Sequence, residues 1–387
     1  MAFFSFKRVL SVLIILGILF SVASININAK ENIENEMTFD CKSAILMEAT
    51  TGTILYEFNA DTPLPPASVT KIMTLLLVME EIEKGNLNYN DTVTTSAYAA
   101  SMGGSQIYLK EGEQMSVEDL VKSVVIASAN DAAVALAEHI CGSEALFVQR
   151  MNDRARELGM VNTHFENTNG LDDTTVSHVT SARDIAIMSR ELIKHEQILK
   201  YSSIWMDTIR NGEFGLTNTN RLVRFYKGAT GLKTGSTSKA KFCVSATAKR
   251  DNMHLICVVM GAPSSDVRNS IATSLLNWGF SNFELYENPD IKLNPIKVTS
   301  GVENQCSIHA LDFSFVVKKG DTKYINTRII LPNTMCAPIS VGDEIGAVEY
   351  LLNGKIIGKS PIVSDMNISK IEFTELFIRI LSKFLIK

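Results

Sequence analysis

The sequence predicts an α/β (α+β) domain with an antiparallel sheet and a helical cluster, followed by a small all-β domain and a C-terminal amphipathic helix. Strand-like segments occur near residue 45 and again after residue 211, whereas most residues between them follow a helical period. Strands at both ends with helices between them indicate one sheet assembled from distant segments. After Pro289 the composition changes to short apolar runs separated by turn signals, which predict a second, β-rich domain.

The first strands are predicted in the segment CKSAILMEATTGTILYEF (41–58), where apolar and polar residues alternate around a Thr-Gly turn. Three prolines at positions 63, 65 and 66 then break the chain. A strongly helical stretch follows and ends at Gly85, a residue type that often terminates helices. Ser68 and Lys71 are therefore expected on the first turn of this helix.

The middle of the chain is predicted to be mostly helical. Its periodicity indicates helices over residues 117–141, 145–158 and 181–195, the last preceded by Thr and Ser as cap residues. The pattern then changes to strands over residues 241–249 and 254–261, which are short apolar runs with β-branched residues on either side of a turn. These strands are expected to complete the sheet that the first hairpin begins.

The C-terminal segment IEFTELFIRILSKFLIK has apolar residues at helical spacing and charged residues on the other side. We interpret it as an amphipathic helix that lies on a membrane surface, because it is too short and too charged to span a bilayer. The alternative is a final helix packed on the protein's own core.

The first residues predict export. Lys7 and Arg8 precede an almost unbroken apolar run from Val9 to Phe20, and small residues follow, which is typical of a secretory signal peptide. An uncleaved N-terminal anchor is the alternative. The predicted divisions are a signal peptide at 1–29, the α/β domain at 36–285, the β-rich domain at 290–365 and the amphipathic helix at 367–387.

Composition and spacing exclude several classes of function. The formal net charge is −5 and the basic residues are scattered, which argues against a nucleic-acid partner. The six cysteines are widely separated, with no C-x-x-C pair of a metal site. The segment from His195 begins like the zinc-binding H-E-x-x-H motif but ends in Leu199. We therefore expect neither a metal nor a cofactor.

The segment Ser68-Val69-Thr70-Lys71 is the first indication of a catalytic site. A serine hydroxyl is a weak nucleophile unless a base removes its proton and donors stabilise the resulting oxyanion. Residues three apart on a helix share one side, so the Lys71 amine can reach the Ser68 hydroxyl. A lysine crowded by other cations can lose its proton at neutral pH. The free backbone N–H groups of the helix start, including that of Ser68, can donate to an oxyanion.

Two further motifs supply the rest of an acyl-transfer site. Ser128 and Asn130, separated by one alanine, offer a hydroxyl for proton relay and an amide for holding substrate within an otherwise apolar run. The segment Lys233-Thr234-Gly235 precedes a predicted edge strand. Its lysine adds a positive charge, its threonine can bind a carboxylate, and its glycine lets a substrate backbone approach.

The S-x-x-K, S-x-N and K-T-G motifs occur in the order found in penicillin-binding proteins and class A β-lactamases. The surrounding segments PPASVTKIMT, GGSQIYL, SANDAA, MNDRARELGM, GLKTGST and VVMGAP resemble those of low-molecular-mass penicillin-binding proteins that are serine-type D-alanyl-D-alanine carboxypeptidases. The resemblance covers residues 41–283. Lys241 stands where a glycine is common in these relatives, a variation that resembles the sporulation-associated branch of the family.

The resemblance implies a role for each motif residue in the catalytic step. Ser68 would be the acylated nucleophile and Lys71 its general base. Ser128 and Asn130 would serve proton transfer and substrate positioning.

The resemblance also implies how the substrate is held. Lys233 and Thr234 would bind its terminal carboxylate, and the backbone N–H groups of Ser236 and Ser68 would form the oxyanion hole. Arg268 falls where the family places a basic residue that helps to hold the carboxylate. For Arg268, a solvated loop arginine is the alternative.

The implied substrate is a peptidoglycan stem peptide ending in D-Ala-D-Ala, with β-lactam antibiotics as covalent inhibitors. Together with the predicted signal peptide and amphipathic helix, this places the protein at the outer face of the bacterial cytoplasmic membrane.

Two other functions share this pattern. A β-lactamase needs a carboxylate that activates the deacylating water, in a Glu-x-x-Leu-Asn segment of class A enzymes, and residues 166–170 (ENTNG) lack that pattern. A non-catalytic penicillin-binding sensor has no need of a nucleophile and base, yet both are present. Carboxypeptidase activity is therefore the favoured hypothesis.

Overall fold

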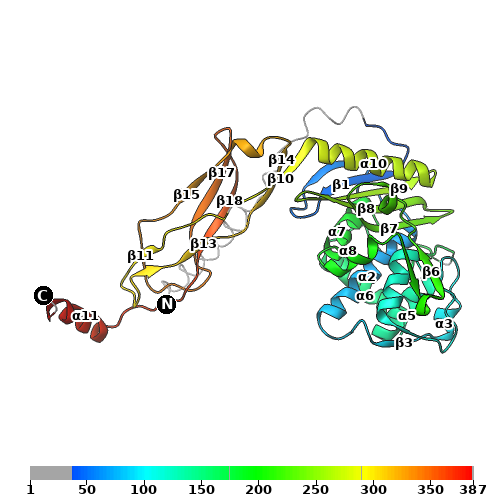
Figure 1. Cartoon of the computed structure of the whole chain (residues 1–387), viewed down its shortest axis with the longest axis horizontal. Helices are drawn as coiled ribbons and strands as arrows, with labels where there is room; N and C mark the ends of the chain where they lie inside the picture. The colour runs from blue at the N-terminus through cyan, green and yellow to red at the C-terminus, as the bar shows by residue number, and fades with distance from the viewer. Residues whose placement is uncertain (1–36, 174, 289, 386–387) are drawn as a thin grey trace, which may run out of the picture. The chain divides into compact units, whose positions relative to one another are not determined.

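The computed structural model of the protein describes residues 37–173, 175–288 and 290–385. A five-stranded antiparallel sheet, in the order β2-β1-β9-β8-β7, lies at the centre of its α/β domain (Figure 1). As predicted, its strands come from both ends of the domain. They are β1 (Ser43–Glu48), β2 (Ile54–Phe58), β7 (Ala229–Thr237), β8 (Lys241–Arg250) and β9 (Met253–Ala262).

Helices cover both faces of this sheet. Successive residues of a strand point to opposite sides, so each inner strand contributes side chains to both contacts. Ile45 of β1 belongs to the core beneath the helical cluster. Leu46, its neighbour, faces helix α10 (Ser265–Asn282), which lies along the other face (Figure 1). Gly279 permits this close packing, since a Cβ there would come within 2.8 Å of Leu46 Cδ2. No helix was predicted over the residues of α10.

The helical cluster on the first face follows the predicted order. The helix predicted at 181–195 is α7, and Ser181 caps it by accepting a hydrogen bond of 3.1 Å from the Asp184 N–H. The cluster consists of α2 (Lys71–Glu83), α3 (Ala97–Ala100), α4 (Val117–Lys122), α5 (Asn130–Cys141), α6 (Glu144–Glu157), α7 (Ala182–Leu192), α8 (Glu196–Ser202) and α9 (Leu222–Phe225). Two small hairpins, β3 (Thr92–Thr94) with β4 (Gln114–Ser116) and β5 (Met206–Ile209) with β6 (Phe214–Thr217), flank it.

The prediction of one continuous helix over 117–141 was wrong. The chain passes through a widened π-type turn at Ser123–Ala127, and Ser128 then adopts a left-handed conformation (φ 64°, ψ 30°) before α5 begins. The buried carboxylate of Asp131 accepts the N–H groups of Ile107 and Leu109, and the Asn130 N–H donates to Ser105. These bonds tie the start of α5 to the 103–109 loop, so a break there leaves few polar groups unsatisfied.

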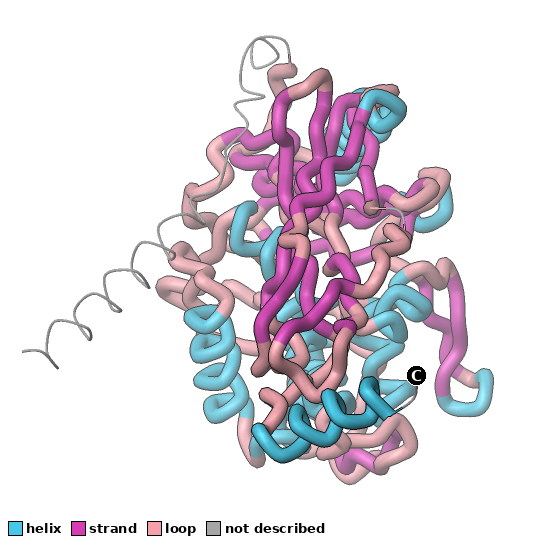
Figure 2. The backbone as a smooth tube through the Cα atoms, turned by 90° about the vertical axis from the view of Figure 1, so that its left-hand side faces the viewer, coloured by secondary structure: helices cyan, strands magenta, loops and turns pink. Residues whose placement is uncertain are grey.

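The C-terminal part is a β domain, as predicted, and its strands lie side by side in Figure 2. Its largest sheet has the order β13-β18-β17-β15, and smaller sheets pair β10 with β14 and β11 with β12 and β16. The strands are β10 (Phe283–Glu287), β11 (Ile296–Thr299), β12 (Gln305–Cys306), β13 (Ile308–Ala310), β14 (Ser314–Lys318), β15 (Ile325–Ile330), β16 (Thr334–Cys336), β17 (Glu344–Leu352) and β18 (Lys355–Ser364). Tyr350 is fully buried at the centre of this domain's own core.

A final helix, α11 (Phe373–Leu385), follows the β domain, in agreement with the sequence. No helix within the described ranges combines the length and the apolar content that a membrane crossing requires. The predicted signal peptide lies outside the described residues.

Replacement of Phe147 by alanine should lower the free energy of unfolding of the α/β domain by about 3–5 kcal/mol, because this side chain is completely buried on α6. Leu146, the preceding residue, is 54% exposed, and Leu146→Ala should change the stability by less than about 0.5 kcal/mol. The chain's two tryptophans, Trp205 and Trp278, both belong to the α/β domain, so urea unfolding followed by tryptophan fluorescence reports on this domain. Equal losses in both variants would contradict the assigned core.

Candidate active site

Ser68 lies in a single 3-10 turn, Ala67–Thr70, that runs directly into α2. Side chains three residues apart eclipse one another in such a turn, so Ser68 and Lys71 point the same way. Lys71 Nζ lies 3.0 Å from Ser68 Oγ. The expectation that these two groups meet at the start of a helix is met, with a 3-10 turn in place of the first α-helical turn.

The Lys71 amine is completely buried and held from three sides. Besides Ser68, its Nζ donates to Asn130 Oδ1 at 2.5 Å and to the Asn169 carbonyl oxygen at 2.9 Å. Burial, and then the nearby charge of Lys233, hold the pKa of Lys71 well below 10.5, although the Asp131 carboxylate opposes this shift. A neutral amine at this position can accept the proton of the Ser68 hydroxyl.

Both the oxygen and the nitrogen of the Asn130 side-chain amide make hydrogen bonds. Its Oδ1 accepts from Lys71, and its Nδ2 donates to the Gly103 carbonyl oxygen at 2.7 Å. Ser68, Lys71 and Asn130 therefore form one hydrogen-bonded chain. Ser128 lies at the helix break two residues earlier and is 3% exposed, but within the described part of the chain its hydroxyl makes no hydrogen bond to Ser68 or Lys71.

The Lys233-Thr234-Gly235 segment lies on β7, directly beside the turn that carries Ser68. A Cβ at Gly235 would come within 2.8 Å of the Ser68 nitrogen and of the Pro66 carbonyl oxygen. The strand can therefore approach the nucleophile only because this residue has no side chain. Thr234 Oγ1 donates to Thr219 Oγ1 at 2.8 Å, and Ser236 continues the strand beyond the glycine.

Two further buried cations make this region electropositive. Lys233 is 1% exposed, and burial, then the charge of Arg268, lower its pKa to about 7. Arg268 lies on α10, is 4% exposed and donates to the Cys243 carbonyl oxygen at 3.3 Å. Burial lowers its pKa to about 10. The alternative of a solvated loop arginine was therefore wrong, and the two cations with Lys71 favour an anionic ligand.

The 165–180 loop also contacts the residues of the site, although the sequence analysis gave it no role there. Its Asn169 carbonyl binds Lys71, and Gly170 (φ 83°) packs so closely that a Cβ would overlap the Ala67 carbonyl oxygen. His178 Nε2 lies 2.8 Å from Thr70 Oγ1, and His178 Nδ1 accepts the Glu166 N–H. Polar residues without periodicity predict only a loop, so no sequence signal pointed to these contacts.

The same loop is tied to the turn between β7 and β8. Thr237 Oγ1 and Lys239 Nζ both donate to Asp172, the first to its carboxylate at 2.5 Å and the second to its carbonyl oxygen at 2.6 Å. Lys241 ends this turn with a φ of 57°, a left-handed conformation that a glycine would adopt without strain.

No three His, Cys, Asp or Glu side chains converge as metal ligands would anywhere in residues 37–173, 175–288 or 290–385. All six cysteines fall in these ranges, and each is a free thiol.

Comparisons with known proteins agree with this geometry. The model of the D-alanyl-D-alanine carboxypeptidase family matches residues 30–264, and the model of the C-terminal domain of penicillin-binding protein 5 matches residues 280–370. The D-alanyl-D-alanine carboxypeptidase DacF of Bacillus subtilis is 42% identical over 95% of this chain and 96% of its own length. DacC of Escherichia coli, also named a D-alanyl-D-alanine carboxypeptidase, is 33% identical over 88% of each chain.

Solved structures show the same relationship. Penicillin-binding protein 5 of Haemophilus influenzae superposes with a TM-score of 0.76 at 32% identity, covering 86% of this chain and 99% of that one. Penicillin-binding protein D2 of Listeria monocytogenes, solved in its ampicillin-bound form, covers 63% of this chain and 99% of its own with a TM-score of 0.58 at 32% identity. With its three motifs gathered around one buried lysine, the chain therefore belongs to the D-alanyl-D-alanine carboxypeptidase family of penicillin-binding proteins.

Proposed function

We propose that the protein is a serine-type D-Ala-D-Ala carboxypeptidase that removes the terminal D-alanine from peptidoglycan stem peptides through an acyl-enzyme on Ser68. The observation that carries this proposal is the pairing of Ser68 Oγ with the buried Lys71 amine at 3.0 Å. The family and the names of the relatives supply the class of substrate.

In the proposed reaction, Ser68 Oγ attacks the carbonyl carbon of the penultimate D-Ala while Lys71 takes its proton. The backbone N–H groups of Ser68 and Ser236 stabilise the oxyanion. The C–N bond to the terminal D-Ala then breaks, and its nitrogen receives, through Ser128, the proton that Lys71 took from Ser68. Water attacks the Ser68 ester, which releases the shortened peptide and returns the proton to the serine.

Substrate recognition depends on the terminal carboxylate. Lys233, Thr234 and Arg268 are proposed to bind it, because the charge of Arg268 acts on the buried Lys233 and Thr234 is the next residue of β7. The Thr234 hydroxyl, which donates to Thr219 here, would turn to donate to the carboxylate. A β-lactam carries a carboxylate and a strained amide, so it should occupy the same place and acylate Ser68. A Listeria relative has been solved with ampicillin bound.

We further propose that α11 holds the enzyme at the outer face of the cytoplasmic membrane. Several of its apolar side chains are uncovered: Phe373 is 80% exposed, Phe377 56% and Ile378 66%. Large exposed apolar side chains on one short helix are typical of a membrane-surface helix.

Ser68→Ala should abolish both covalent labelling by a fluorescent penicillin and release of D-alanine from diacetyl-Lys-D-Ala-D-Ala, because the nucleophile is lost. Ser203→Ala, which changes an exposed serine on the same domain, should retain both activities. Labelling of the parent protein without D-alanine release would favour a sensor, and labelling of Ser68→Ala would place the nucleophile elsewhere.

Arg268→Gln should change the pH profile of kcat/KM in two ways. Loss of a charged carboxylate donor should lower the profile by roughly 10- to 100-fold. Because the charge of Arg268 depresses the pKa of Lys233, its removal should raise that pKa, keep Lys233 protonated to higher pH and move the basic limb upward from about pH 7. Arg156→Gln, at a guanidinium 74% exposed on α6, should leave the profile unchanged. A basic limb that stays in place in Arg268→Gln would contradict carboxylate binding by Lys233.

A chain ending at Glu372 should no longer sediment with vesicles of phosphatidylethanolamine and phosphatidylglycerol, while its penicillin labelling persists. The cut is placed there because Ile368, which is 1% exposed, exchanges two backbone hydrogen bonds with Ile339 and so belongs to the β domain. In the full chain, Phe373→Glu with Phe377→Glu should also prevent binding, whereas Ser382→Glu should not. Undiminished binding of the truncated chain would exclude α11 as the anchor.

A further inference from the structure

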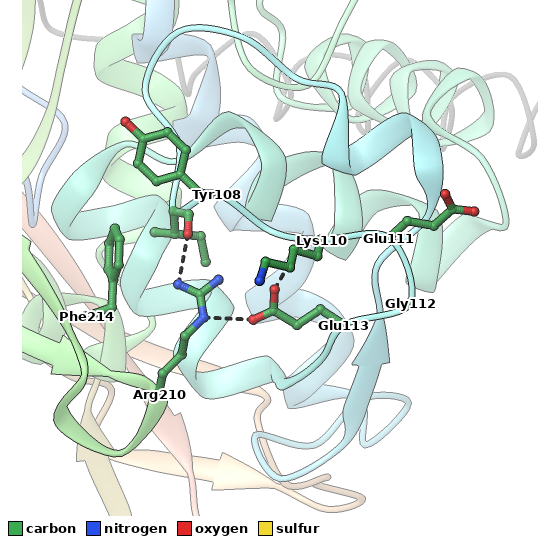
Figure 3. Close-up of a pocket in the computed structure, with 8 residues that line it drawn as sticks. Tyr108, Lys110, Glu111, Gly112, Glu113, Arg210 and Phe214 are labelled. Carbon is green, nitrogen blue, oxygen red and sulfur yellow. Dashed lines mark hydrogen bonds and ion pairs between the residues drawn. The ribbon is translucent and has the colours of Figure 1, made fainter.

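A hollow of about 580 Å³ lies outside the catalytic centre (Figure 3). Its aromatic side is formed by Tyr108 and Phe214, whose rings meet edge to face with 6.3 Å between centroids. Its polar side is formed by Arg210 and by residues 110–113. No role in the acyl-transfer step falls to any of these residues.

The two segments that line this hollow both lead to residues that are hydrogen-bonded to the active-site motifs. The loop that carries Tyr108 starts at Gly103 and Ser105, whose carbonyl oxygens accept the side-chain and backbone N–H groups of Asn130. The strand that carries Phe214 leads to Thr219, which accepts a hydrogen bond from Thr234.

These connections limit the distance between hollow and active site. Tyr108 is three residues from Ser105, and Phe214 is five residues from Thr219, so the chain spans at most about 10 Å and about 17 Å. A stem peptide of five residues spans about the same length when extended. The hollow is thus within reach of the end of the stem that is distant from the scissile bond.

The hollow is held in shape by a fixed set of contacts, which the sticks of Figure 3 display. Arg210 donates to Glu113 Oε1 at 2.7 Å and to the Ile107 carbonyl oxygen at 2.9 Å, and its guanidinium lies 5.2 Å from the centre of the Phe214 ring. The Lys110 N–H donates to the second oxygen of Glu113. Tyr108 and Arg210 have φ values of 59° and 53°, conformations that non-glycine residues keep only where the surroundings determine them.

The open surfaces of the hollow suit a sugar. Tyr108 is 66% exposed, and its ring offers an apolar face on which the C–H groups of a pyranose ring can stack. The exposed side chains of Lys110 and Glu111 provide a hydrogen-bond donor and an acceptor at the rim for hydroxyl and acetamido groups. In peptidoglycan, the amino sugars are attached to the end of the stem peptide that lies farthest from D-Ala-D-Ala.

We propose that this hollow, the Tyr108 subsite, binds the amino-sugar end of peptidoglycan while the stem peptide extends from it to Ser68. The proposal rests on the carboxypeptidase function proposed above. The Tyr108 subsite would favour stem peptides still attached to glycan over free peptides.

Tyr108→Asn tests the proposal, because asparagine tolerates a left-handed conformation and lacks the aromatic ring. The variant is compared with the parent on three substrates: diacetyl-Lys-D-Ala-D-Ala, the free pentapeptide and the pentapeptide carrying its N-acetylglucosaminyl-N-acetylmuramyl disaccharide. We expect kcat/KM to fall about three- to tenfold, mainly through KM, on the disaccharide substrate alone. Penicillin labelling should not change. Tyr108→Trp should restore most of the loss, and Tyr324→Asn, at an exposed tyrosine of the β domain, should have no effect.

Three results would overturn the proposal. Equal losses on all three substrates would mean that the variant disturbs Asn130, and equal losses on the two pentapeptides would assign the hollow to peptide. No loss on any substrate would show that the hollow takes no part in substrate binding.

A measurement without catalysis separates this proposal from the carboxypeptidase function. Calorimetric titration of Ser68→Ala with the peptide-free disaccharide should show binding that Tyr108→Asn weakens three- to tenfold. If the parent enzyme releases no D-alanine but the disaccharide still binds in this manner, the function fails and the subsite stands. If D-alanine is released but the disaccharide does not bind, the subsite fails alone.

Discussion

The burial of the Lys71 amine is the constraint on which the rest of the site depends. An ammonium group removed from water is costly, so the protein surrounds this nitrogen with the Ser68 hydroxyl, the Asn130 amide oxygen and the Asn169 carbonyl. Each partner comes from a different segment, and Lys71 thereby fixes the nucleophile turn, the start of α5 and the 165–180 loop relative to one another. The same burial that lowers the pKa of the amine thus also holds these three segments together.

The framework around this lysine consists of close backbone approaches. Gly235 brings β7 against the Ser68 turn, and Gly170 brings the 165–180 loop against the same turn from another side. Gly279 lets α10 pack closely on the sheet, and α10 in turn carries Arg268, whose charge acts on Lys233. These glycines therefore determine how closely the segments that carry the charged groups can approach one another.

Much of the fold and of the motif set could be predicted from sequence, because both rest on local patterns. Alternation and period predicted β1, β8 and β9 and the helices α2, α6, α7 and α11, and the S-x-x-K spacing predicted the contact between Ser68 and Lys71. What could not be predicted depends on tertiary contacts. The helical run breaks at Ser128 because the 103–109 loop binds the start of α5. The apolar residues of α10 are interspersed with small polar ones, so its sequence shows no clear helical pattern.

The contact between His178 and Thr70 links the nucleophile turn to the acidity of the surroundings. His178 Nδ1 accepts the Glu166 N–H, so Nε2 carries the proton and donates to Thr70, whose hydroxyl donates to the Ala67 carbonyl oxygen. A second proton on the ring would oppose the Glu166 N–H, and burial, first of all, lowers the pKa of His178 to about 4. The unfolded chain then binds more protons than the folded one between about pH 6.5 and 4, so this contribution to stability is lost as the pH falls through that window. Acidification through this window therefore weakens the stability of the segment that hydrogen-bonds both Lys71 and the turn of Ser68, so a wall-trimming enzyme built in this way is tied to the acidity of its surroundings.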